Sequence, residues 1–282
     1  MRKLKTLFTV ILSFCFSFFL IGQDLKQTFN FGKEQFSYGN SSSAALAFER
    51  VLFFSEDSFQ LASLNYLGEI ELRNGQPEKA ANYFNRAYNL CQNRNEAVGY
   101  LLKKCASLLE AGKIDFALID LMSIENEIPD TLLKTRYFLQ GIAQFSRLSF
   151  SESQQSFLLA FDANDLYKRN KIDSLFLALD NIKGPKPKKA RILSMILPGM
   201  GQLYAGDIKN GVNSLLLTGT LLALGINTAI NLTLLDALMT VAPWFQRYYM
   251  GGYNRAENIA AEKFKEKQNR IFLNILSVYD LR

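Results

Sequence analysis

Between residue 25 and about residue 167, small and large apolar residues recur in one pattern that is repeated four times. In the second copy the pattern consists of Leu64, Leu67, Gly68, Gly75, Ala80, Phe84 and Ala87. Equivalent positions place the starts of the copies at Leu25, Leu61, Val98 and Lys134. Within each copy, apolar residues three or four positions apart predict two amphipathic helices. The chain is therefore expected to contain an array of antiparallel helical hairpins with a period of about 34 to 37 residues.

Such hairpins need small residues where the backbones of their two helices approach each other closely. Gly68 and Ala80 stand where the two helices of the second copy approach each other most closely. The first three copies have a glycine at the turn, where a residue without Cβ ends a helix in the left-handed conformation. These glycines are Gly39, Gly75 and Gly112, and the fourth copy has Leu148 at this position.

Over about half of the chain, this pattern resembles the tetratricopeptide repeat family. The resemblance implies that residues 23–167 form an all-α solenoid that holds a protein or peptide partner. In that family the first helix of each unit lines the groove, which implies a largely apolar groove here. Its residues would be Phe29, Phe36, Leu102, Leu109, Phe138, Ile142 and Phe145, with Lys26, Lys33, Asn65 and Arg73 among them. Another kind of helical-hairpin array would share the period and remains an alternative.

An apolar groove of this kind favours an amphipathic helix or an extended apolar peptide as ligand, held by a few aromatic side chains. The alternative occupant is the C-terminal segment of the chain itself. Residues 251–282 alternate charged and apolar residues and predict an amphipathic helix.

Beyond residue 167 the repeated pattern stops. Residues 168–191 form a linker with eight Lys or Arg residues against two Asp, and Gly184, Pro185 and Pro187 interrupt a helix there. A basic segment directly before an apolar one indicates a collar for anionic lipid headgroups. The segment lacks an aromatic stacking platform and a groove-reading helix, so binding to nucleic acid is not expected.

Residues 192–250 are expected to form a membrane domain, a helical transmembrane hairpin. Residues 210–235 contain no charge, over a length sufficient to cross a hydrocarbon layer of ~30 Å. A cluster of aromatic and basic residues that begins at Trp244 is typical of a membrane–water interface. A helix buried in a globular core is the soluble alternative, because four asparagines dilute the apolar run.

A short motif lies at the start of this domain. It consists of Pro198, Gly199, Gly201, Gln202, Tyr204 and Gly206, followed by Gly211. The motif resembles that of the small two-transmembrane domain family, in which Pro-Gly-x-Gly-Gln-x-Tyr precedes the main span. The resemblance implies association with membrane lipid but no particular reaction. The proline and the glycines suit a broken segment, whose backbone groups neighbouring protein must satisfy at membrane depth.

The N-terminus has the pattern of an export signal. Three basic residues precede the apolar residues 7–21, and Gly22 precedes a polar segment. Residues 1–22 are therefore expected to be a signal peptide, either cleaved after Gly22 or retained as an anchor. Export would place the repeats in the periplasm of a bacterial envelope, anchored to its membrane. The number of crossings stays open, because basic residues flank the membrane domain on both sides.

Composition narrows the possible chemistry. The chain is 49% hydrophobic with a net charge of +6, which suits a soluble part joined to a membrane part. It contains no histidine, and beyond the export signal its cysteines are Cys91 and Cys105, for which two free thiols are favoured over a disulfide. Neither a metal site nor a cofactor is expected. Without histidine, and without another nucleophile–base pair, no enzyme activity is expected.

Asp236 is the one acidic residue inside the apolar region. An intramembrane acid is a hypothesis for a functional site, here the handling of a proton or a cation. The alternative is that Asp236 lies at a hairpin turn among the headgroups, where Asn231 and Thr233 mark the bend. The sequence thus predicts a non-enzymatic, membrane-tethered scaffold for protein–protein assembly. The second hypothesis is a small transport or ion-handling element that the repeats regulate.

Overall fold

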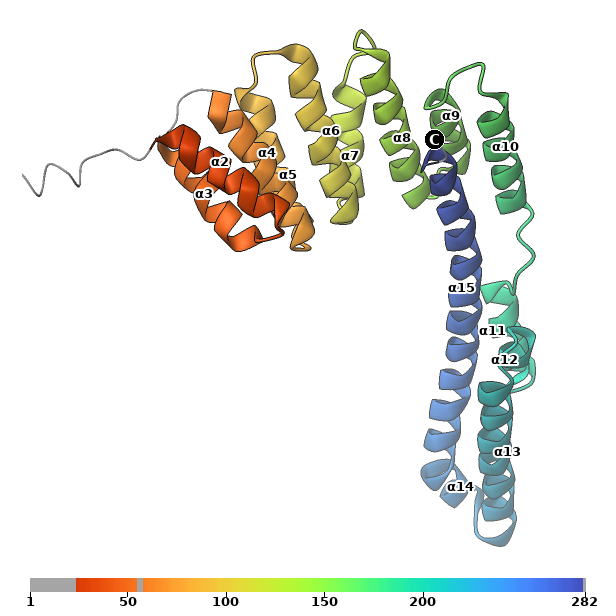
Figure 1. Cartoon of the computed structure of the whole chain (residues 1–282). Coiled ribbons are helices and arrows are strands. Elements are labelled where there is room, and N and C mark those ends of the chain that lie inside the picture. The colour runs from red at the N-terminus through yellow and green to blue at the C-terminus, as the bar shows by residue number, and fades with distance from the viewer. Residues whose placement is uncertain (1–23, 55–57, 281–282) are drawn as a thin grey trace, which may run out of the picture. The chain divides into compact units, whose positions relative to one another are not determined.

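The computed structural model describes residues 24–54 and 58–280, and all regular structure within these residues is helical (Figure 1). The expected all-α class is therefore confirmed. The chain divides into two compact units, Met1–Asn164 and Asp165–Arg282. The export signal predicted for residues 1–22 lies outside the described residues.

The first unit consists of helical hairpins that follow one another along the chain. The two helices of each hairpin pack against each other, and each hairpin packs against the next (Figure 1). The pairs are α2 (Leu25–Ser37) with α3 (Ser41–Phe54), α4 (Ser58–Arg73) with α5 (Pro77–Leu90), α6 (Arg94–Glu110) with α7 (Ile114–Ser123), and α8 (Asp130–Ser146) with α9 (Phe150–Leu159). A core of buried aliphatic and aromatic residues runs between the two helices of successive hairpins.

Small residues allow the close approach of the two helices in each hairpin. A Cβ atom added at Gly68 would lie 2.6 Å from the ring of Phe84, which is closer than atoms can approach. The first hairpin repeats this arrangement with Gly32 and Phe48, and the fourth repeats it with Gly141 and Phe157. The glycine and the phenylalanine of the repeated pattern are thus one packing pair.

The turns within the hairpins use the left-handed backbone conformation. Gly39, Gly75 and Gly112 have φ angles of 80°, 68° and 73°. Leu148, at the same position of the fourth hairpin, has a φ of 63° and is the one non-glycine residue with positive φ among the described residues. The turn geometry is therefore kept where the glycine is replaced, at a steric cost for the leucine.

The second unit begins with α10 (Leu166–Asp180), which packs against the C-terminal part of the long helix α15 (Ala242–Asp280). Between them the chain forms α11 (Pro187–Ile196), α12 (Met200–Tyr204), α13 (Ile208–Asn231) and α14 (Leu234–Thr240). Helix α13 and the first part of α15 lie side by side, with α14 at the end of the hairpin (Figure 1). Residues 242–280 form one continuous helix, so the membrane domain and the amphipathic helix expected on either side of residue 250 share this element.

Candidate functional site

The first helices of the hairpins, α2, α4, α6 and α8, contact one another in order along the first unit. We call the surface that they form together the first-helix face. Three junctions divide this face, between α2 and α4, between α4 and α6, and between α6 and α8. The side chains at these junctions decide what the face can bind.

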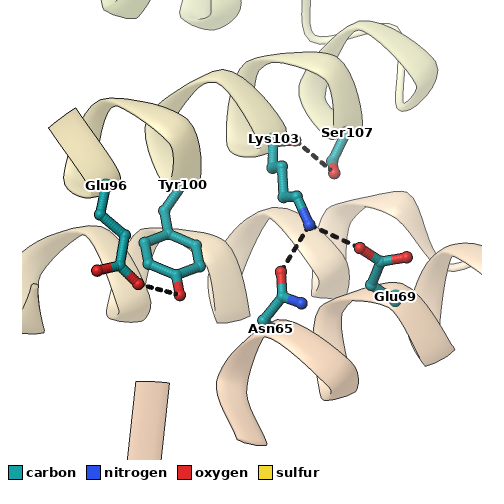
Figure 2. Close-up of polar contacts among 6 residues, drawn as sticks. All are labelled: Asn65, Glu69, Glu96, Tyr100, Lys103 and Ser107. Atoms are coloured by element: carbon teal, nitrogen blue, oxygen red, sulfur yellow. Dashed lines mark hydrogen bonds and ion pairs between the residues drawn. The ribbon is translucent and has the colours of Figure 1, made fainter. Parts of the chain in front are cut away.

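The α4–α6 junction is polar. The Lys103 ammonium group donates hydrogen bonds to the Asn65 amide oxygen and to the Glu69 carboxylate, both at 2.7 Å (Figure 2). The side chains of Lys103 and Glu69 remain 43% and 38% exposed. A partly exposed ion pair contributes only about 0–1 kcal/mol to stability. The pair is therefore available to exchange its hydrogen bonds with a ligand at little energetic cost.

One helical turn away, Tyr100 extends this polar surface. Its hydroxyl donates a hydrogen bond of 3.0 Å to the Glu96 carboxylate (Figure 2). Partial burial, followed by the hydrogen bond and the negative charge of Glu96, raises the pKa of Tyr100 from 10.0 to about 12. The phenol is therefore neutral throughout the physiological pH range and acts as a hydrogen-bond donor.

The α2–α4 junction combines a cation with an aromatic ring. The guanidinium carbon of Arg73 lies 3.7 Å from the centroid of the Phe36 ring, and Arg73 also donates a 3.2 Å hydrogen bond to the Phe36 carbonyl. Stacking of this kind is worth about 0.5–1 kcal/mol at an exposed site. One face of Phe36 is therefore already covered by the chain's own arginine.

The seven residues predicted for an apolar groove divide into two groups. Phe29, Leu102 and Phe145 are buried in the core. Half-buried side chains are found at the other positions, Phe36, Leu109, Phe138 and Ile142. Leu109, Phe138 and Ile142 each pack against one buried cluster formed by α6, α7 and α8, and the Phe138 ring also lies 5.8 Å from the Phe157 ring of α9. The apolar part of the first-helix face is thus gathered at the α6–α8 junction.

Lys103, Glu69 and Tyr100 were not among the groove residues expected from the sequence. A signal for them does exist, because Lys103 follows Glu69 by 34 residues, which is about one repeat period. Opposite charges one period apart on first helices are placed to pair across a junction.

In the second unit, the predicted motif forms a buried hydrogen-bond network. The Ser194 hydroxyl donates to the Gln202 amide oxygen at 2.8 Å, and the Gln202 amide nitrogen donates to the Gly252 carbonyl at 2.8 Å. The Ser194 hydroxyl also accepts a 2.9 Å bond from the backbone of Gly201. Gln202 is 1% exposed and joins α11, α12 and α15. This network satisfies polar groups where the chain is broken between α11 and α12.

Glycines of the motif lie where two segments of the backbone come close together. Gly199 has a φ of 90°, and a Cβ atom there would collide with the Gly211 carbonyl. A Cβ atom on Gly201 would collide with the Ala190 carbonyl. The hydroxyl of Tyr204 accepts a 3.3 Å hydrogen bond from the backbone of Lys186, and Gly206 has a φ of 77° at the turn into α13. The motif residues are therefore used for packing, turns and internal hydrogen bonds.

Asp236 lies in the first turn of α14. Thr233 precedes this helix and accepts a 3.1 Å hydrogen bond from the Asp236 backbone, while its hydroxyl donates to the Asp236 carboxylate at 2.6 Å. A side chain that accepts from the backbone three residues later is a helix N-cap. The carboxylate is thus held by the turn between α13 and α14.

In the described part of the chain, few side chains could hold a metal ion or form a disulfide. Within it, no group of three or more Cys, Asp and Glu residues is placed to hold a metal ion. Cys91 and Cys105 are both free thiols, and Cys105 is buried against Ala117 and Leu121. Burial, and after it the negative charge of Asp120, raises the pKa of Cys105 from 9.0 to about 12. Such a thiol is a packing residue and a poor nucleophile.

Comparison with known proteins gives no further guide to this site. No family model, no curated protein and no solved structure matches the chain. Among the described residues, α13 is the one helix that is long and apolar enough to cross a membrane, and it is almost entirely unburied.

Proposed function

We propose that this chain is a non-enzymatic scaffold of the bacterial envelope. Its tetratricopeptide-like first unit would bind a protein or peptide partner on the periplasmic side, and its second unit would tether it to the membrane. The observation that carries the proposal is the first-helix face, on which partly exposed hydrogen-bonding groups lie next to a half-buried apolar cluster. A face of this composition supports peptide binding by an apolar anchor together with polar contacts.

The ligand best supported is an amphipathic helix or an extended peptide with apolar anchor residues. The anchors would occupy the α6–α8 junction, where Leu109, Phe138 and Ile142 are half-buried. Polar groups of the ligand would face Lys103 and Glu69 at the α4–α6 junction. The second hypothesis, ion handling at Asp236, has no comparable support, because that carboxylate is part of a helix cap.

Lys103 offers a test at a partly exposed position, and its ammonium group also lies 5.6 Å from the centroid of the buried Phe84 ring. Lys104 is its neighbour on α6 but pairs at 2.8 Å with Asp120 of α7, within the same hairpin. We therefore compare Lys103→Gln with Lys104→Gln as a matched control. Wild type and Lys104→Gln are expected to retain the same partner in detergent-solubilised membranes, whereas Lys103→Gln is expected to bind it at least about tenfold more weakly, a loss of about 1.4 kcal/mol.

A charge swap separates binding from folding. The double variant Lys103→Glu/Glu69→Lys keeps the ion pair but reverses its direction across the junction. We expect loss of the partner with a folded protein whose stability falls by no more than about 1 kcal/mol, because the swap also removes the Lys103 cation from the Phe84 ring. If the partner is bound equally by wild type and by both Lys103 variants, the first-helix face is not the binding surface.

A further inference from the structure

Helix α13 carries a polar stripe that consists of Asn213, Thr220 and Asn227. These residues follow one another at intervals of seven, and all three are exposed, with the exposed Asn231 one turn beyond them. We propose that the polar stripe is an interface at which α13 of one copy of the chain binds α13 of a second copy inside the membrane. This inference rests on the proposed membrane tether and adds a partner for it.

The polar stripe lies on the side of α13 that faces away from the rest of the second unit. The other side of the helix is covered. A Cβ atom at Gly225 would lie 3.5 Å from Val241, one at Gly252 would lie 2.9 Å from the Ser214 hydroxyl, and Thr218 is buried. With about 3.6 residues per turn, the stripe falls on nearly the opposite side of the helix from these contacts. Its amides and hydroxyl therefore point to whatever surrounds the second unit.

In a bilayer, hydrocarbon would surround the polar stripe. Thr220 is at the middle of the 24 residues of α13, and Asn213 and Asn227 lie one heptad to either side. At about 1.5 Å per residue these asparagines are about 10 Å from the middle, whereas the hydrocarbon extends to about 15 Å. Within the described residues, no hydrogen bond involves the side chains of Asn213 and Thr220. Lipid tails cannot supply one, so a second helix is the occupant that suits this face.

Asn227 is oriented for a contact of this kind. The Asn231 amide nitrogen donates to the Asn227 amide oxygen at 2.7 Å and to the Asn227 carbonyl at 3.0 Å. These bonds identify the acceptor end of the Asn227 amide and leave its nitrogen as a donor. An amide oxygen has two lone pairs and can accept a second hydrogen bond. Two Asn227 side chains that meet at a two-fold axis can therefore each donate to the other.

Spacing and symmetry favour a second copy of this chain over the helix of another protein. Residues seven apart stay on the contact side when two helices cross at about +20°, the usual geometry in membranes. Copies of one chain insert in the same direction, so a two-fold axis along the membrane normal places each stripe residue opposite its own counterpart. Asparagine and threonine each donate and accept, and so can pair with themselves. A helix of different sequence would need polar residues of its own at the same three depths.

Cysteine cross-linking in native membranes locates the interface. Thr220→Cys places a thiol on the polar stripe. Gly219→Cys is the matched control, because this neighbouring position is exposed and no atom lies within 4 Å of an added Cβ. Both full-length variants and wild type are oxidised with copper–phenanthroline and separated on non-reducing gels. We expect a disulfide-linked dimer from Thr220→Cys and not from Gly219→Cys, with wild type as the measure of linkage through the native cysteines.

Energy transfer between donor- and acceptor-labelled copies in phospholipid vesicles then measures the affinity. Asn213→Leu/Asn227→Leu is expected to raise the dissociation constant of the dimer at least about tenfold, a loss of about 1.4 kcal/mol. Asn254→Leu/Asn258→Leu is the control, because it removes two exposed asparagines from α15 and leaves the polar stripe unchanged. It is expected to associate as wild type does.

Several results would overturn the inference while leaving the tether in place. Equal association of the two double variants, or equal dimer from the two cysteine variants, would mean that the copies do not meet along the polar stripe. A vesicle-bound protein that stays monomeric, or a Thr220→Cys variant that cross-links only to a different protein, would exclude a second copy as the occupant. Failure of the protein to float with the vesicles would instead refute the tether, and the inference with it.

Discussion

At the scale of single residues, three of the four copies of the repeated pattern share a packing pair of one glycine and one phenylalanine. The repeated pattern marked these residues, but it paired Gly68 with Ala80, whereas the structure places Gly68 against the ring of Phe84 in the same hairpin. Other residues were misplaced. Phe29 and Phe145 are at positions that the family resemblance assigns to a groove, yet both are buried among neighbouring rings. A large ring on a first helix can turn inward, and periodicity does not distinguish the two directions.

Two glycines on first helices should respond in opposite ways to substitution by alanine. Gly68→Ala places a methyl group against the Phe84 ring, and overpacking of this kind costs about 1–3 kcal/mol. Gly99→Ala adds a methyl group with no atom within 4 Å and is expected to stabilise the protein by about 0.5–1 kcal/mol, because alanine favours the helix. Denaturant unfolding of the full chain in detergent measures both changes. Equal effects of the two substitutions would contradict the packing argument.

The buried thiol of Cys105 predicts a loss of stability in alkali. Its pKa is raised from 9.0 to about 12 in the folded protein, so folding favours the neutral thiol. The stabilisation of the folded state by the neutral Cys105 thiol is fully present below pH 9 and is lost as the pH rises towards 12. Unfolding curves from pH 8 to 11 should therefore depend less on pH in Cys105→Ala than in wild type. Cys91→Ala, which changes a half-buried thiol, serves as the control and should follow the wild-type curve more closely.

At the scale of helices, the division expected at residue 250 falls inside the continuous helix α15. The sequence was divided at residue 250, between an expected membrane domain (192–250) and an expected amphipathic helix (251–282). Instead α15 continues, because Gly252 lies against Ser214 and its carbonyl accepts a hydrogen bond from Gln202. The glycine is needed for this approach and costs the helix only about 1 kcal/mol. Gln202 and Gly252 are 50 residues apart in sequence, so their contact cannot be predicted from local helix propensity.

Gln202 should be the side chain on which the second unit depends most. Gln202→Ala removes the partner of Ser194 and of the Gly252 carbonyl at a site that is 1% exposed. Leaving buried polar groups without partners costs about 1–3 kcal/mol each. Gln246→Ala is the matched control, because Gln246 is exposed and bonds only to the Met250 sulfur. Limited proteolysis should release fragments cut near residues 197–207 from Gln202→Ala and not from the control.

At the scale of the whole molecule, the sequence predicted the helical class and a change of character after the repeats, since composition and periodicity both change there. It did not predict which polar groups face a ligand. Lys103 and Glu69 are brought together by the packing of α4 against its neighbouring hairpin, and Asp236 is held by Thr233 at a turn. These positions depend on how helices are rotated about their axes. Apolar periodicity fixes that rotation only to within the width of the buried stripe.

The two units should unfold independently, because each encloses a core of its own. The first contains clusters around Phe48 and Leu102, and the second contains one in which Ala190, Ala256 and Ala260 pack together. Calorimetry of the full chain in detergent is expected to show two transitions. Gly68→Ala should lower only the transition of the first unit, and Gln202→Ala only that of the second, since substitutions without shared partners act additively. One transition shifted by both variants would mean that the two cores are energetically coupled. A ligand held on the first-helix face would then change the stability of the second unit as well.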